Sequence, residues 1–243
     1  MDPHGHDAPP VEGVAPTQPL KARKTWRWRR SVRRHPSAFL LAAQLLSLLL
    51  YPLMDDSQSG RLLFGAVALV VVPLAVWVVN RSRFVTGLAW TLAVPAMAMT
   101  VIGVAFEREA LLPISALFEA ALYFYAAASL ISYMLHDHEV TGDELFAAGA
   151  TFTLLAWGFA YAFFVCQAWY PGSFTGLQPE RERKWMELLA YSFSNLSATG
   201  LGDTVPVSSP ARVLTMLEQF AGVGYIATVV SRLIGLTIMR SRR

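Results

Sequence analysis

Long apolar runs separated by short polar segments account for most of the chain. An α-helix crosses the bilayer core with about 20 apolar residues, and the six longest runs approach or exceed that length. Prolines inside the runs are compatible with membrane helices, because neighbouring helices satisfy the carbonyl groups that a proline frees. The pattern therefore predicts six membrane-spanning helices, at residues 37–53, 62–79, 84–106, 110–135, 145–170 and 211–239.

Composition agrees with this reading. Hydrophobic residues make up 54% of the 243 residues and charged residues only 15%, which is far from the balance of a soluble domain. We therefore predict an all-α polytopic membrane protein. Its single cysteine, Cys166, excludes an intrachain disulfide, and we expect no nucleic-acid partner.

Basic residues predict the orientation of the chain. Residues 1–20 contain five prolines and are expected to be a disordered tail. The following segment, residues 21–36, holds eight Lys or Arg and should lie on the cytoplasmic side, and after six crossings Arg240 returns to that side. The stretch Lys21 to Arg34 either binds anionic lipid headgroups or only sets the topology.

A short helix is predicted between the fifth and sixth runs. Pro179 suits the first position of a helix of roughly 15 residues that ends near Ser197, too short to cross the bilayer. Pro206 then turns the chain back, and Ser209 and Pro210 can cap and begin the last helix. Residues 145–239 therefore read as one re-entrant pore domain, with the irregular backbone buried in protein or facing a water-filled cavity.

The loop of that unit, Ser197-Ala198-Thr199-Gly200-Leu201-Gly202-Asp203, is typical of an ion filter. A filter points successive backbone carbonyls at a cation, which requires backbone angles at alternate residues that glycine adopts easily. Gly200 and Gly202 have that spacing. Gly-Leu-Gly-Asp alone would fit an ordinary extracellular loop, but the short helix before it and Pro206 after it favour a filter formed by Ser197 to Gly202.

Residues from about 145 to 235 resemble the pore domain of the tetrameric potassium channel family, and are similar to small prokaryotic members with six helices and no charged voltage sensor. One pore loop cannot enclose an ion, so the expected assembly is a homotetramer. The resemblance implies passive conduction of monovalent cations, most of all K⁺, as a multi-pass protein of the cell membrane with cytoplasmic termini. Permeant K⁺ is the only ligand expected, with no cofactor and no metal centre.

Three filter positions depart from the family pattern T-V-G-Y-G-D. Ala198 lacks the hydroxyl of the family threonine, Thr199 replaces valine, and Leu201 lacks the hydroxyl of the family tyrosine. These departures make a weakly selective cation channel the first alternative. Asp203 matches the acid that in the family anchors the filter to the pore helix, with Tyr191 or Ser194 as its expected partner.

Four residues are candidates for gating. Gly222 and Gly224 lie in the last helix, where a glycine permits either a hinge or close helix packing. Glu218 is an ionisable group within the same membrane segment; it either pairs with Arg212, faces the pore helix or attracts ions. Glu119 in the fourth helix either bonds to neighbouring helices or responds to protons.

Residues 37–135 are predicted to form a four-helix peripheral bundle, joined to the pore domain by a cytoplasmic linker at 136–144. Between residues 84 and 135 the only basic residue is Arg108, so arginine-driven voltage sensing is not expected. The linker sequence His136-Asp137-His138-Glu139 could bind a metal or sense pH, but we expect it to be solvated.

An enzyme is not expected. The chain contains no Ser-His-Asp arrangement, no H-E-x-x-H motif and no P-loop. A second alternative to conduction is a membrane scaffold or sensor that has a pore-like fold but passes no ions.

Overall fold

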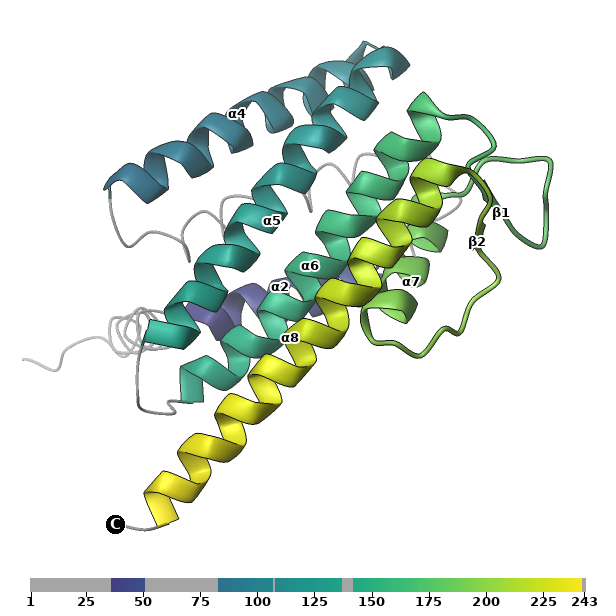
Figure 1. Ribbon diagram of the computed structural model, residues 1–243. Helices are drawn as coiled ribbons and strands as arrows, with labels where there is room; N and C mark the ends of the chain where they lie inside the picture. The colour runs from purple at the N-terminus through teal and green to yellow at the C-terminus, as the bar shows by residue number, and fades with distance from the viewer. Residues whose placement is uncertain (1–35, 51–82, 107, 137–141, 242–243) are drawn as a thin grey trace, which may run out of the picture. The chain divides into compact units, whose positions relative to one another are not determined.

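The computed structural model describes residues 36–50, 83–106, 108–136 and 142–241. These residues are almost entirely helical (Figure 1). In chain order the elements are α2 (Pro36–Leu50), α4 (Arg83–Ala105), the short 3₁₀-helix η2 (Glu109–Leu111), α5 (Leu112–His136), α6 (Gly142–Trp169), β1 (Phe174–Thr175), α7 (Trp185–Leu196), β2 (Val205–Pro206) and α8 (Ser209–Ser241).

Three of the described helices are long and apolar enough to cross a membrane, at Leu112–Leu135, Asp143–Trp169 and Ser209–Arg232. Two shorter apolar helices cover Ser37–Leu50 and Gly87–Gly103. The predicted tail, the basic segment up to residue 35, the run at 62–79 and linker residues 137–141 lie outside the described residues. Six crossings therefore remain a prediction.

The peripheral helices pack through small side chains. Helix α5 contacts both α4 and α6, and α2 contacts α6. Ala89 and Ala93 of α4 and Ala116 and Ala120 of α5 are buried in one cluster. Small residues allow membrane helices to approach closely, so that van der Waals contact replaces the hydrophobic driving force that lipid removes.

Helices α6, α7 and α8 all contact one another. Figure 1 shows α8 running along α6, with the short α7 and the strand pair near one end of both. The span of α6 is 72% buried within the chain, whereas that of α8 is only 22% buried. Helix α6 is thus internal to the fold, and most of α8 faces outward.

The structure corrects three local expectations. Strands β1 and β2 form an antiparallel pair with Phe174 opposite Pro206, so the fold is not purely helical. Helix α7 has 12 residues and begins at Trp185, not at Pro179. Ser208, not Ser209, caps α8, since its hydroxyl accepts a hydrogen bond from the Ala211 N–H at 3.3 Å.

Candidate functional site

The start of α7 is held by an acid in its first turn. Glu187 accepts a hydrogen bond from the Lys184 backbone N–H at 2.6 Å, which satisfies a donor that a helix start leaves open. Both carboxylate oxygens of Glu187 also accept from the Arg181 guanidinium, at 2.6 and 2.7 Å. These hydrogen bonds from Arg181 hold the pKa of Glu187 below its ordinary value.

The loop before α7 is organised by Arg183 and Gln167, neither of which the sequence pattern singled out. Arg183 is buried, and its guanidinium donates to the carbonyls of Gln178 and Arg181. The side chain of Gln167 on α6 accepts from the Arg183 N–H at 2.9 Å and donates to the Arg183 carbonyl at 3.1 Å. Because these contacts satisfy the backbone of the loop, the helix begins only after Arg183.

Three aromatic rings join α6, β1 and α7. Phe163 lies 5.1 Å from Tyr191 and 5.4 Å from Phe174, measured between ring centroids, and Phe174 lies 5.8 Å from Tyr191. Such distances suit the edge-on and tilted packing that aromatic rings prefer. The cluster holds β1, in the loop before α7, next to that helix.

The predicted filter folds back onto the end of α7. The Ser194 carbonyl accepts hydrogen bonds from the N–H groups of Thr199 at 3.0 Å and Gly200 at 3.2 Å, and from the Thr199 hydroxyl at 3.2 Å. The last carbonyl groups of a helix have no N–H partner within the helix, and these hydrogen bonds supply partners for the carbonyl of Ser194. The Thr199 hydroxyl thus joins the predicted filter to α7.

Left-handed backbone angles occur at alternate residues of the loop, but at Ala198 and Gly200 rather than at the predicted Gly200 and Gly202. Ala198 has φ +57° and Gly200 has φ +65°. Gly202 is not among the residues with positive φ, so the expectation for it was wrong. Ala198 accepts a conformation that costs an L-residue about 1–2 kcal/mol, because the hydrogen bonds from the loop to α7 impose it.

Side chains in the second half of the loop are exposed in the single chain. Leu201 is 78% exposed, and Asp203 is exposed as well. The Tyr191 hydroxyl bonds to Thr215 at 2.8 Å rather than to Asp203. Ser194 contacts the predicted filter through its backbone carbonyl. The support of the filter by Asp203 therefore stays a prediction.

A row of polar contacts joins α7 to α8. The Tyr191 hydroxyl donates to Thr215, because the Thr215 hydroxyl donates to the Ala211 carbonyl. Further along, Ser192 bonds to Glu218, and Gln219 donates to the Asn195 side chain at 3.1 Å. We call these three contacts the polar seam.

The α8 residues of the seam are Thr215, Glu218 and Gln219, and Gly222 lies on the same helix face. A Cβ on Gly222 would overlap the Leu196 carbonyl. These α8 residues follow the spacing i, i+3, i+4 and i+7 of one helix face. That spacing of small and polar residues in an apolar run is the sequence signal that could have identified the seam.

Glu218 is fully buried and faces α7. This is one of the arrangements expected from the sequence. The other candidate partner, Arg212, donates instead to the Pro206 carbonyl at 3.3 Å. Glu218 therefore contributes to the join between α7 and α8, and it is not exposed to ions in the single chain.

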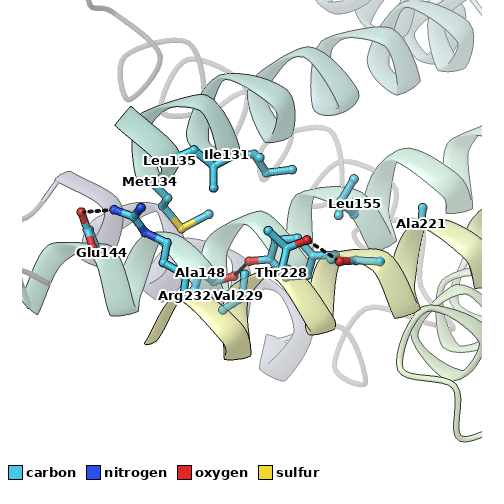
Figure 2. Close-up of a pocket in the computed structure, with 12 residues that line it drawn as sticks. Ile131, Met134, Leu135, Glu144, Ala148, Leu155, Ala221, Thr228, Val229 and Arg232 are labelled. Atoms are coloured by element: carbon cyan, nitrogen blue, oxygen red, sulfur yellow. Dashed lines mark hydrogen bonds and ion pairs between the residues drawn. The ribbon is translucent and has the colours of Figure 1, made fainter. Parts of the chain in front are cut away.

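Gly224 lies away from the seam, and a Cβ there would meet nothing within 4 Å. It lines a cavity of about 250 Å³ between α5, α6 and α8. Figure 2 shows the cavity with Arg232 and Glu144 at one end, 3.4 Å apart as an ion pair. The ion pair joins Arg232 of α8 to the first turn of α6.

Glu119 is buried between the peripheral helices. Its carboxylate accepts a hydrogen bond from the Thr100 hydroxyl of α4 at 2.9 Å. Tyr161 of α6 interacts with the same carboxyl group, and the Tyr161 ring lies 4.2 Å from Trp185 at the start of α7. Glu119 therefore bonds to neighbouring helices, and the contacts of Tyr161 connect it to the start of α7.

Within the described residues, no three His, Cys, Asp or Glu side chains gather as a metal site would require. Most of the sequence His136 to Glu139 lies outside them.

Comparison with known proteins identifies a family for part of the chain. The model of the ion channel family matches residues 149–238. No curated protein and no solved structure matches the chain. The matched range contains most of α6, all of α7, the glycine loop and nearly all of α8, which is also the region whose sequence resembles a potassium channel pore. Residues 149–238 of this membrane protein are therefore an ion channel domain.

Proposed function

We propose that four copies of this chain form a central pore that passively conducts monovalent cations, with K⁺ preferred, through the backbone of Ser197 to Gly202. The observation that carries the proposal is the loop itself. Its left-handed residues alternate, and its first N–H groups bond to the end of α7. A helix end directs its carbonyl dipoles towards that point, which favours a cation.

The outward face of α8 supports assembly. Large apolar side chains along it are exposed, among them Val213, Met216, Leu217, Phe220 and Val223. Phe220 alone is 81% exposed. Lipid can cover such a surface, but one filter strand cannot enclose an ion, so copies of α8 around one axis are the arrangement that also completes the filter.

The weakly selective cation channel is the second candidate function, and Leu201 is the observation that favours it. Its exposed side chain carries no hydroxyl with which to brace the outer filter against a neighbouring aromatic ring. A less constrained filter discriminates less sharply between cations, if selectivity depends on the geometry of the carbonyl groups.

A flux assay with purified protein in liposomes tests both functions. Flux of K⁺ and Rb⁺ with little Na⁺ supports the first, and equal flux of all three supports the second. Absence of flux in a folded protein would contradict conduction and favour the scaffold.

Native mass spectrometry of the same sample should give four chains; a monomer or dimer would overturn the assembly. We propose the cell membrane location and the cytoplasmic termini together with this function. Labelling in intact cells of cysteines introduced at either end of the chain tests the orientation.

A further inference from the structure

Ser192 makes two hydrogen bonds that bear on the protonation state of Glu218. The Ser192 hydroxyl lies 2.7 Å from the Ala156 carbonyl of α6 and is also hydrogen-bonded to Oε1 of Glu218. A hydroxyl has one proton to donate, and the Ala156 carbonyl can only accept. Both bonds form fully only if Ser192 donates to Ala156 while Glu218 carries a proton and donates to Ser192.

The surroundings of Glu218 also favour a neutral acid. Its side chain is fully buried, and within the described part of the chain no cation pairs with it. On α7 the titratable group that interacts with it is Tyr191; α6 presents the Ala156 carbonyl; on α8, Arg212 is bonded to Pro206. A buried carboxylate without a countercharge is strongly unfavourable.

From this geometry we propose that Glu218 is a positioning residue that works as a neutral carboxylic acid: its proton joins α8 to α7, and through Ser192 to α6, behind the filter. The inference rests on the proposed function, because in that function α7 carries a conducting filter. Ser192 lies two residues before Ser194, whose carbonyl holds Thr199 and Gly200.

Loss of the proton to water would weaken this join. The carboxylate would then compete with the Ala156 carbonyl for the Ser192 proton and would draw water to a buried interface. The helix that carries the filter would be held less firmly, so conduction should fall as the solution becomes alkaline. A glutamine at this position keeps a donor for Ser192 and cannot ionise.

Potassium flux into liposomes, with the same pH on both sides, tests the consequence. The wild-type protein should lose flux at alkaline pH by about fivefold, the factor that one hydrogen bond typically contributes. Glu218→Gln should keep its flux across the series. The matched control Glu180→Gln, at an exposed acid in the loop before α7, should follow the wild type. A Glu218→Gln profile identical to that of the wild type would overturn the proposal.

Infrared spectroscopy of the full chain in lipid tests the proton independently of flux. The wild-type protein at neutral pH should show the carbonyl stretch of a protonated carboxyl group that is absent from Glu218→Gln. Ser192→Ala, which removes the acceptor, should shift this band to higher frequency; if Glu218→Gln does not fold, this shift identifies the group. A wild-type spectrum without such a band overturns the proposal. A band without flux would instead contradict the proposed conduction and leave the neutral acid standing.

Discussion

Gly222 of α8 lies directly against the backbone of Leu196 at the end of α7, so closely that a Cβ on Gly222 would overlap the Leu196 carbonyl. The contact is between two backbones, which cannot rotate away as a side chain can. Gly222 is therefore a packing glycine in this structure, and its role in gating stays a prediction.

Substitution of Gly222 by alanine should destabilise the protein by about 1–3 kcal/mol, because overpacking against backbone exceeds the gain in helix propensity. Thermal unfolding of the purified protein in detergent measures the effect. Gly224→Ala is the matched control, since open space surrounds that position, and it should be neutral or stabilising by up to about 1 kcal/mol. Equal effects at the two glycines would show that the close approach to Leu196 is not formed.

Ala198→Gly should relieve the left-handed backbone at the start of the filter. Ala198 has φ +57°, so glycine removes a strain of about 1–2 kcal/mol, partly offset by its greater freedom in the unfolded chain. The expected result is an unchanged or raised unfolding temperature. Ala198→Thr should lower it, because a β-branched residue is poorly suited to this conformation.

The same strain affects how selectivity is tested. Restoration of the family threonine at Ala198 combines a new hydroxyl with a strained backbone, whereas Leu201→Tyr changes an exposed side chain. We therefore expect Leu201→Tyr alone to raise the ratio of K⁺ to Na⁺ flux in liposomes without a loss of stability. An unchanged ratio would show that Leu201 does not limit selectivity.

Stability should fall at acidic pH through Glu187. Its folded-state pKa lies below its ordinary value, chiefly because Arg181 donates hydrogen bonds to it. A lowered pKa stabilises the fold above the unfolded-state pKa, and this contribution is lost as pH falls through the folded-state value. Unfolding temperatures measured from neutral to acidic pH should decrease less in Glu187→Gln than in the wild type. A parallel decrease in both would assign the acid sensitivity to other groups.

Gln167→Leu should destabilise the loop before α7. The change removes two hydrogen bonds between the Gln167 side chain and the backbone of Arg183, and leaves a buried donor and acceptor without partners, at about 1–3 kcal/mol each. Gln178→Leu is the control, because the side-chain bond of Gln178 to Arg181 is exposed. Limited proteolysis of the loop should accelerate in Gln167→Leu alone.

The positions of the main helices could be predicted closely from the sequence. The apolar runs place the boundaries of α5, α6 and α8 within three residues of those observed, because a membrane segment needs apolar side chains along its whole length. The start of α7 could not be placed, since it depends on Arg183 and Gln167, residues 16 positions apart. The left-handed angle at Ala198 was missed for a related reason: alanine has no local preference for it.

By itself, the sequence determined that this is a membrane protein with a glycine-containing loop between a short helix and a long one, because apolar length and glycine spacing are local properties of the chain. Only the tertiary structure decided which residues join the short helix to the long one. Ser192 and Glu218 are 26 positions apart, and Gly222 and Leu196 also come from different helices. Their contacts depend on how α7 and α8 pack, and hydropathy does not record this.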